Sequence, residues 1–336
     1  MRKYRLRFRS WHQSLLSYSG ISKSRNLTNG KKMRDHKIHC HKNKKPHKEA
    51  IMLQQPISFH RTNGGVGAFV ENIDLSQPIP AETSKEIKQN LGDYGVLFFR
   101  NQKLDPNAHQ AFAEGLGVID VNRFFKPVDG YPKIAEVRKE PEQVYAIGED
   151  WHTDHSYDQV PALGSILLAR ELPQHGGDTM FANMYLAYDA LSEGLKKVLD
   201  DLQAEHSSRH RFGGQATVSK NADDTGGRLG NPELATQDAI HPVIIRHPIS
   251  GKKALYVNKA FTLGIVGWSD PESKALLDFL YDHASRPEFT YRFEWETGSI
   301  AMWDNRATWH RALNDYHGER RLMHRITLEG DELFAD

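Results

Sequence analysis

The sequence predicts a mainly β fold with flanking helices and a double-stranded β-helix, or jelly-roll, core. Short apolar segments of strand type recur through most of the chain with helical segments between them, and a His-x-Asp motif stands at the end of one expected strand. A jelly roll gathers such strands into a barrel whose interior holds a binding site. A doubly wound sheet is the weaker alternative, because no glycine-rich phosphate loop follows the early strands.

The expected elements of the first part follow from apolar periodicity and from capping signals. Asp105 followed by Pro106 is typical of a helix N-cap with proline at the first helical position, so a helix starts there and ends near Gly115–Gly117. The other elements expected in this part are strands over 57–60, 67–73 and 96–99 and a helix over about 84–91.

The second part continues the same alternation after the His-x-Asp motif. A polar segment over 207–238, rich in Gly, Asn and Asp, interrupts it, and a loop of this length in a compact domain predicts a lid-like insertion. The remaining expected elements are strands over 165–170, 179–181, 241–246 and 254–257, turns at Gly176-Gly177 and Ser250-Gly251, a helical stretch ending near Leu202, a helix over about 271–285, and four further strands up to Leu328.

Charge separates the first residues from the rest of the chain. The 336 residues carry a net charge of +1, yet residues 1–50 hold 15 Lys and Arg against Asp35 and Glu49, a local net charge of +13. The remainder has 29 basic and 41 acidic residues, a net charge of −12. We therefore expect a basic leader over 1–55 and a single folded domain over 56–336. A domain of this charge has no general attraction to nucleic acid.

The leader lacks the periodic apolar positions that would let it pack, which predicts disorder. An organellar transit peptide fits as well, because residues 1–34 contain arginine and serine and no acidic residue. A third alternative is an upstream extension of the reading frame, since Met52 comes shortly before the first expected strand. The sequence leaves these alternatives open, together with a role of the leader in anchoring the chain to nucleic acid or anionic lipid.

The only cysteine, Cys40, excludes an intramolecular disulfide and with it the class of disulfide-stapled extracellular proteins. A reducing compartment fits, so we expect a cytoplasmic protein, or a protein of an organellar matrix if the leader is a transit peptide. No stretch approaches the roughly 18–20 apolar residues of a membrane helix, so no membrane span is expected. The oligomeric state stays open, a homo-oligomer included.

A candidate metal site is spread over distant positions. On a strand, His152 and Asp154 share one face about 6.6 Å apart, and Thr153 points away. A neighbouring strand lies only about 4.8 Å away, so His310 can supply a third ligand. Two histidines and one carboxylate form the facial triad that holds non-haem Fe(II) and leaves positions open for a co-substrate and oxygen. The His-x-Asp pattern alone is weak evidence, because His317-Gly318-Glu319 is a similar instance.

The last expected strand carries the basic run Arg320–Arg325. Its alternation places Arg321 and Arg325 on one face, about 13 Å apart. Buried guanidinium groups need anions, and a bidentate guanidinium–carboxylate pair is a strong charge-assisted contact. Two such groups near an open metal site could hold a diacid and an anionic substrate separately. The alternative is an exposed edge strand whose basic residues prevent aggregation.

Several motifs occur along the chain in a characteristic order. They are Trp151-His152-Thr153-Asp154, Gly176-Gly177-Asp178-Thr179, His241-Pro242-Val243, Trp303-Asp304-Asn305-Arg306 with His310, and Arg320–Arg325. Over about residues 56–330 the chain resembles the taurine dioxygenase and 2,4-dichlorophenoxyacetate dioxygenase family of Fe(II)- and 2-oxoglutarate-dependent oxygenases. The resemblance implies that the protein hydroxylates a substrate with O2 and releases succinate and CO2 from 2-oxoglutarate.

The resemblance also assigns roles to individual residues, none of them a protein nucleophile. Thr179 and Arg321 hold the distal carboxylate of 2-oxoglutarate, and Arg325 meets the anionic group of the substrate. A non-catalytic barrel that only binds 2-oxoglutarate is the alternative, and it would keep Arg321 without decarboxylating its ligand. The implied iron ligands are His152, Asp154 and His310.

The expected substrate pocket departs from that of taurine enzymes. Phe212 and Phe261 fall where those enzymes wall the substrate, although both could be plain core residues. Asn122 and Phe125 stand where taurine enzymes carry a polar His and Tyr, and His155 replaces a small apolar residue. These differences argue against taurine itself. We expect a small anionic organic substrate, such as a taurine-like sulfonate or a carboxylate, to which His155 could hydrogen-bond.

Overall fold

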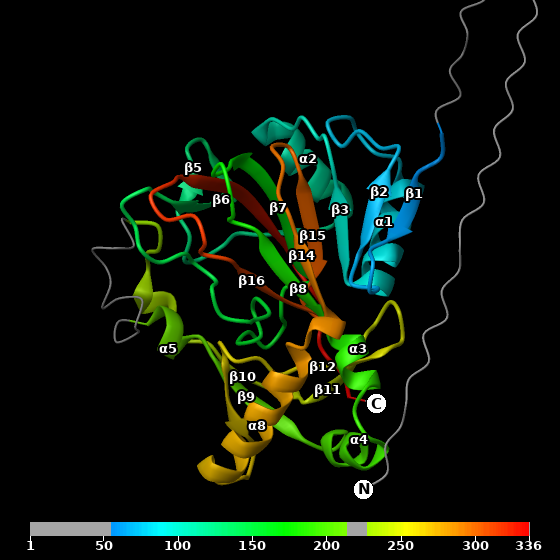
Figure 1. The fold of residues 1–336 in the computed structure, drawn as a ribbon, viewed down its shortest axis with the longest axis vertical. Coiled ribbons are helices and arrows are strands. Elements are labelled where there is room, and N and C mark those ends of the chain that lie inside the picture. Colours follow the sequence, from blue (N-terminus) through cyan, green and yellow to red (C-terminus); the bar gives the residue numbers. More distant parts are fainter. Residues whose placement is uncertain (1–54, 214–226, 336) are drawn as a thin grey trace, which may run out of the picture. The chain divides into compact units, whose positions relative to one another are not determined.

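Antiparallel strands dominate the computed structural model, which describes residues 55–213 and 227–335 (Figure 1). The strands of the largest sheet are β1 (Ser58–Arg61), β2 (Ala68–Glu71), β3 (Val96–Phe99), β4 (Ile119–Asp120), β5 (Pro127–Val128), β6 (Tyr131–Lys139), β7 (Gly164–Glu171), β15 (Ile300–Asp304) and β17 (Arg321–Leu328). They follow the order β1-β2-β3-β15-β7-β17-β6-β5, with β4 also paired to β17. Only β2 and β3 pair in parallel among these strands.

Three smaller sheets complete the strands of the described residues. One has the order β14-β8-β16, a second the order β10-β9-β13, and β11 pairs with β12. Their bounds are β8 (Thr179–Asn183), β9 (Gln203–Ser207), β10 (Asp238–Pro242), β11 (Ile244–Arg246), β12 (Lys253–Leu255), β13 (Thr262–Ile265), β14 (Thr290–Phe293) and β16 (Thr308–Ala312).

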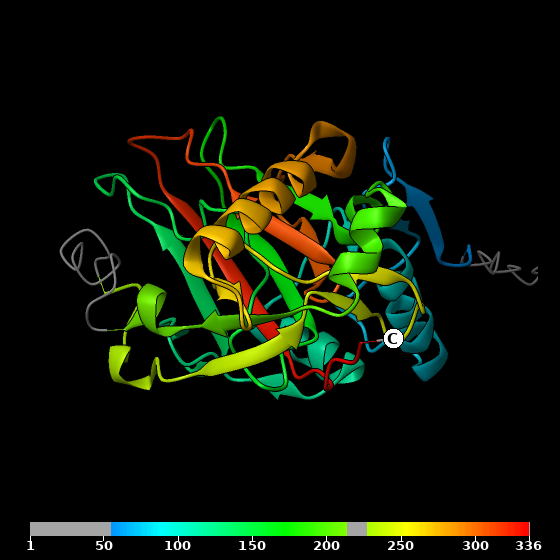
Figure 2. The same ribbon diagram turned by 90° about the horizontal axis from the view of Figure 1, so that it is seen from below.

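Helices cover both sides of this arrangement. The outer face of the large sheet packs against α1 and α2, and α3 and α8 pack with β11 and β12 in a separate core cluster. Figure 2 shows α8 in the foreground, well apart from α1 and α2. The bounds are α1 (Ala81–Tyr94), α2 (Pro106–Leu116), α3 (Met184–Asp189), α4 (Glu193–Leu199), α5 (Arg209–Phe212), η1 (Pro232–Leu234), α8 (Asp270–Ala284) and η2 (Pro287–Phe289).

Strand β3 illustrates why the large sheet is buried on both faces. Leu97 and Phe99 belong to the core under α1 and α2, whereas Val96 and Phe98 belong to the core shared with the β14-β8-β16 sheet. This division follows from the alternation of side chains along a strand. Full burial of a large apolar side chain contributes about 1.5–3 kcal/mol, so both faces stabilise the sheet.

Aromatic rings fill the space between the large sheet and the β14-β8-β16 sheet. The ring of Phe98 stacks on Phe293 at 4.3 Å and meets the edge of Phe181 at 5.5 Å, and Phe181 lies 5.8 Å from Trp303. Phe98 and Trp303 come from the large sheet, and the other two rings come from the small sheet. The two sheets therefore face each other across a layer of aromatic rings.

Elements with strong local signals form as predicted. Asp105 caps α2 by accepting a hydrogen bond from the Ala108 backbone N–H at 2.8 Å, and β3 has the predicted bounds 96–99. The turn glycines Gly176 and Gly251 have φ angles of 76° and 70°, which favour glycine.

Some expectations about strands are wrong. The single strand expected over 241–246 is two strands, because β10 pairs with β9 while β11 pairs with β12. The His-x-Asp motif does not lie on a regular strand: His152 makes only an isolated bridge to His310, and Asp154 opens a turn. His155 in that turn has a φ angle of 62°, so the chain leaves the extended conformation directly after the motif.

The sequence did not predict strands β4, β5, β6, β9 and β13, although β6 pairs directly with β17. The predicted leader lies outside the described residues except at its C-terminal end. Residues 214–226 of the predicted insertion over 207–238 also lie outside them.

No helix within 55–213 or 227–335 combines the length and apolar composition needed to cross a membrane.

Candidate metal centre

His152, Asp154 and His310 converge at one end of the aromatic layer. One potential ligand atom from each lies within 4.8 Å of the others. Asp154 is central, since its Oδ1 lies 3.7 Å from His152 Nε2 and its Oδ2 lies 3.9 Å from His310 Nε2. Two reciprocal backbone hydrogen bonds of 3.1 and 2.8 Å join His152 to His310. Two imidazoles and one carboxylate on one side of a centre suit the facial binding of Fe(II).

The two histidine rings are held in different ways. Nδ1 of His152 lies 2.8 Å from the backbone carbonyl of Asp150, which leaves Nε2 free to face the centre. Nδ1 of His310 is buried and has no hydrogen-bond partner among the described residues. Its ring packs instead at 4.5 Å from Trp303 and 6.4 Å from Phe181. Strand β16 and its packing, rather than a hydrogen bond, therefore orient the His310 ring.

The charge states of the three groups suit a metal. Burial lowers the pKa of His152 and lowers that of His310 well below its ordinary value, so both imidazoles are neutral near pH 7. Burial opposes the ionisation of Asp154, but the Arg325 guanidinium beside it holds the pKa of this carboxyl well below its ordinary value. Neutral imidazoles and an ionised carboxylate are the forms that bind metal.

A cavity of about 350 Å³ opens beside the triad. Arg321 and Arg325 line it from β17, and both are buried, at 5% and 7% exposure. Strand β17 lies between β7 and β6 in the large sheet. The alternative of an exposed basic edge strand is therefore wrong.

Arg321 lacks an anionic partner in the described structure. Its Nε and one terminal nitrogen are buried without hydrogen-bond partners there, and burial lowers the pKa of the guanidinium. Thr179 lines the same cavity, and its hydroxyl accepts a hydrogen bond of 3.0 Å from Trp295 Nε1. A buried guanidinium without a partner is costly, so this part of the cavity is suited to an anion.

Arg325 lies closer to the triad. Its terminal nitrogen donates to Asp154 Oδ2 at 3.2 Å, and its guanidinium lies 4.4 Å from the centre of the Phe125 ring. A carboxylate and an aromatic face thus hold this cation at the boundary between the triad and the apolar part of the cavity.

The structure brings most predicted substrate residues to the cavity, but not all. Phe125, Phe212 and Phe261 line it, together with Arg325. His155 and Asn122 do not. Three aromatic rings of the predicted set thus face the cavity, whereas its two hydrogen-bonding members, Asn122 and His155, do not.

The two remaining residues have local partners. His155 Nδ1 lies 2.9 Å from Asp158 Oδ2. Asn122 Oδ1 accepts hydrogen bonds from the backbone N–H groups of Phe124 and Phe125 at 2.9 and 3.0 Å. Both side chains therefore shape the backbone next to the cavity rather than its surface.

Three residues at the cavity were not anticipated from the sequence. Arg211 and Arg228 of the polar segment 207–238 line it, and the Trp295 indole N–H donates to the Thr179 hydroxyl. The presence of basic residues within a polar insertion was the only signal for the first two. For Trp295 the sequence offers none, because its role depends on the pairing of β14 with β8.

Comparison with known proteins places this geometry in a family. The family described as "Taurine catabolism dioxygenase TauD, TfdA family" matches residues 56–327. The chain is 35% identical over 281 residues to an alkylsulfatase of Acinetobacter baylyi, covering 82% of this chain and 86% of that one. It is 33% identical over 289 residues to an alpha-ketoglutarate-dependent sulfate ester dioxygenase of Pseudomonas putida, covering 82% and 90%.

Solved structures agree with the sequence relatives. A taurine dioxygenase from Burkholderia xenovorans superposes with a TM-score of 0.69 at 33% identity, covering 83% of this chain and 93% of that one. The structure of AAD-2 in complex with Mn(II) and N-oxalylglycine gives 0.67 at 28% identity, covering 83% and 99%. The chain therefore belongs to the TauD, TfdA family and is a 2-oxoglutarate-dependent dioxygenase that uses Fe(II) and O2.

Proposed function

We propose that this enzyme hydroxylates a C–H bond of an organic molecule with one anionic group and an apolar body. One observation carries the proposal: three metal-binding groups and a buried guanidinium without an anion line the same cavity. The metal triad suits iron with open positions, and the guanidinium suits a second carboxylate at a distance from the metal. A five-carbon diacid meets both requirements.

The roles of the protein groups follow from this arrangement. In the proposal, His152, Asp154 and His310 hold Fe(II), which supplies the oxidising chemistry with O2 and 2-oxoglutarate when bound. Arg321 and the hydroxyl of Thr179 bind the distal carboxylate of 2-oxoglutarate. A bidentate guanidinium–carboxylate contact fixes both position and direction. The protein thus binds and orients the co-substrate and excludes water from it.

The aromatic part of the cavity lining supports a substrate with a larger apolar body than that of taurine. Phe125, Phe212 and Phe261 offer aromatic surface, and Arg325 offers one cation next to it. Two relatives bear names that refer to sulfate esters. We propose an alkyl or aryl sulfate, sulfonate or carboxylate whose anionic group meets Arg325 and whose carbon body lies against the three rings.

The double-stranded β-helix and the lid also remain proposals. Two largely antiparallel sheets that face each other across an aromatic layer support the jelly-roll core. Arg211, Phe212 and Arg228 of the segment 207–238 line the cavity, which supports its role as a cover over the substrate. A single catalytic domain from residue 56 onward and a cytoplasmic or organellar location complete the proposal.

A turnover assay tests the function. Full-length protein with Fe(II), ascorbate and 2-oxoglutarate is offered straight-chain alkyl sulfates, sulfonates and carboxylates of matched chain length. We expect succinate formation that requires both Fe(II) and one of these classes. Oxygenation at the carbon bonded to the anionic group would release sulfate from an ester and sulfite from a sulfonate, so these anions identify the class. If the protein binds 2-oxoglutarate tightly but forms no succinate in the presence of any of these acids, a non-catalytic barrel is favoured.

A further inference from the structure

A buried hydrogen bond joins the two distant parts of the candidate metal site. Thr153, between the two ligands of the His-x-Asp motif, is 2% exposed. Its hydroxyl donates to the backbone carbonyl of Asn305 at 2.6 Å, across 152 residues of sequence. We propose that Thr153 is a positioning residue, which sets His152 and Asp154 against a rigid turn over 304–307. This inference rests on the proposed function, because it concerns the same metal site.

Asn305 is held from several directions. Its backbone N–H donates to the Leu163 carbonyl at 2.8 Å, and its side-chain amide donates to the Ala162 carbonyl at 3.1 Å. Its side-chain oxygen accepts from Trp303 Nε1 at 3.0 Å. The Asn305 carbonyl is therefore fixed in position, and its hydrogen bond to the Thr153 hydroxyl fixes Thr153 in turn.

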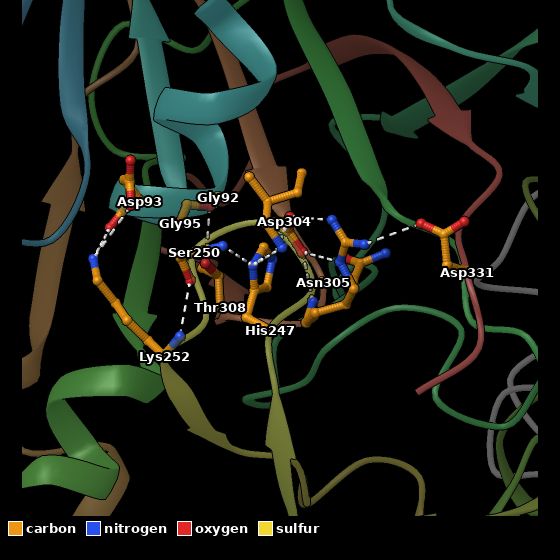
Figure 3. A network of polar contacts seen from close by, with 12 residues as sticks. Gly92, Asp93, Gly95, His247, Ser250, Lys252, Asp304, Asn305, Thr308 and Asp331 are labelled. Atoms are coloured by element: carbon orange, nitrogen blue, oxygen red, sulfur yellow. Dashed lines mark hydrogen bonds and ion pairs between the residues drawn. The ribbon is translucent and has the colours of Figure 1, made fainter. Parts of the chain in front are cut away.

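An ionic network around Asp304 also fixes this turn (Figure 3). Asp304 and Arg306 are 0% and 1% exposed. Arg306 donates from Nε to Asp304 Oδ1 at 2.9 Å and from a terminal nitrogen to Asp304 Oδ2 at 2.7 Å. His247 Nε2 lies 3.0 Å from the same Oδ2. Each oxygen of the buried carboxylate thus has a cationic or N–H partner.

The geometry identifies the tautomer of His247. Its Nδ1 accepts a hydrogen bond from the backbone N–H of Ser250 at 3.1 Å, so the proton of the neutral ring is on Nε2. That proton is donated to Asp304. Residues of the loop after β11 thereby help to hold the turn between β15 and β16.

The turn also determines the position of His310, the third candidate ligand. Strand β16, which carries His310, begins at Thr308, directly after the turn, and the Thr308 hydroxyl donates to the Gly95 carbonyl at 2.9 Å. Metal-binding histidines usually donate their second ring N–H to a partner, but His310 Nδ1 has none among the described residues. The position of its ring therefore depends on the backbone of β16 and on Trp303.

These contacts connect all three candidate ligands to one turn. The ionic network holds the turn over 304–307, and strand β16 with His310 follows directly after it. The Asn305 carbonyl of the turn holds Thr153, which lies between His152 and Asp154. The competing interpretation is that the Thr153 bond only stabilises the fold. The two interpretations differ in what a loss of the bond does to metal binding.

The test compares Thr153→Val with Thr153→Ser in the full-length protein. Valine keeps the shape and removes the donor, whereas serine restores the hydroxyl. The control is Thr62→Val, since Thr62 also donates to a backbone carbonyl, that of Val66, at 2.7 Å but belongs to none of the contacts described here. The readouts are the affinity for Co(II), the visible spectrum of bound Co(II) with and without 2-oxoglutarate, and the melting temperature.

We expect Thr153→Val to weaken Co(II) binding about 10- to 100-fold, the usual effect of losing an outer-sphere partner, and to change the Co(II) spectrum. Thr153→Ser should recover most of both, and Thr62→Val should lower only the melting temperature. Wild-type Co(II) affinity and spectrum in Thr153→Val would overturn the proposal. If Thr153→Val does not fold, the smaller pair Thr153→Ala and Thr153→Ser gives the same comparison. Absence of Co(II) binding by the wild type would instead refute the metal site itself.

Discussion

Replacement of Arg306 by methionine is expected to cost about 3–5 kcal/mol of unfolding free energy. Methionine is of similar length, but it leaves the buried carboxylate of Asp304 with two fewer charged hydrogen bonds, those of 2.9 and 2.7 Å. Hydrogen bonds to charged groups contribute roughly 1.5–3 kcal/mol each. Breaking a buried ion pair by removing one partner costs a similar total of about 3–5 kcal/mol. His247 still donates to Asp304, so we expect the lower half of this range.

Thermal and urea unfolding measure this loss. At about 2–4 °C per kcal/mol for a domain of this order of size, a loss in the lower half of that range should make Arg306→Met melt roughly 6–16 °C below the wild type. Arg320→Met is the matched control, because Arg320 also pairs with two carboxylates, those of Glu140 and Glu171, but its side chain is 39% exposed. Exposed pairs contribute at most about 1 kcal/mol, so this control should melt close to the wild type.

The double variant Asp304→Asn, Arg306→Met isolates the interaction between the two charges. Removal of both charges leaves no buried ion without a partner, so the double variant should be more stable than Arg306→Met by about 1–3 kcal/mol. Two results would refute the reasoning. One is a loss in Arg306→Met no larger than that in Arg320→Met, and the other is a double variant no more stable than Arg306→Met.

Three further predictions concern the site and the core. His152→Ala should abolish stoichiometric Mn(II) binding measured by electron paramagnetic resonance, while His317→Ala, at the exposed histidine of the His-Gly-Glu sequence, should leave it intact. Arg321→Met should raise the KM for 2-oxoglutarate about 10- to 150-fold, since a charged hydrogen bond contributes roughly 1.5–3 kcal/mol, and Arg320→Met should not. Burial lowers the pKa of His109 from 6.5 to about 3, so the unfolded chain binds the proton first as pH falls. The stability that His109 contributes is therefore complete above pH 6.5 and is lost between pH 6.5 and 3, by about 2 kcal/mol at pH 5. Melting temperatures of the wild type and His109→Gln across this range measure the effect.

Each of these predictions has a contradicting result. Equal metal stoichiometry in the two histidine variants would remove His152 from the metal site. An unchanged KM for 2-oxoglutarate in Arg321→Met would move the co-substrate elsewhere in the cavity. Parallel pH profiles of the wild type and His109→Gln would show that His109 is not buried in its neutral form.

Local signals in the sequence sufficed for several elements. The Asp105-Pro106 cap begins α2, and the apolar run 96–99 is β3, because both depend on residues within one or two turns of each other. The candidate metal residues were also accessible from the sequence. Imidazole, carboxylate and guanidinium groups in this order carry chemistry that few other residue types could supply.

Pairing over long distances was not accessible in the same way. Strand β17 is an interior strand only because β6, which was not expected, covers one of its edges. That burial decides that Arg321 and Arg325 face a cavity rather than solvent. Strand register and strand order depend on contacts between residues more than a hundred positions apart. Apolar periodicity describes only neighbouring positions and therefore does not predict these contacts.

The sequence by itself determined the chemistry of this protein: a set of iron-binding side chains, basic groups for two anions, and a β-rich chain to hold them. Tertiary structure alone decided the geometry. It pairs His152 with His310 in an isolated β-bridge and brings the Asn305 carbonyl to the Thr153 hydroxyl. It also places a turn at His155, which does not line the cavity. The physical reason is that side-chain type sets which bonds a group can form, whereas packing and backbone pairing set which partners it meets.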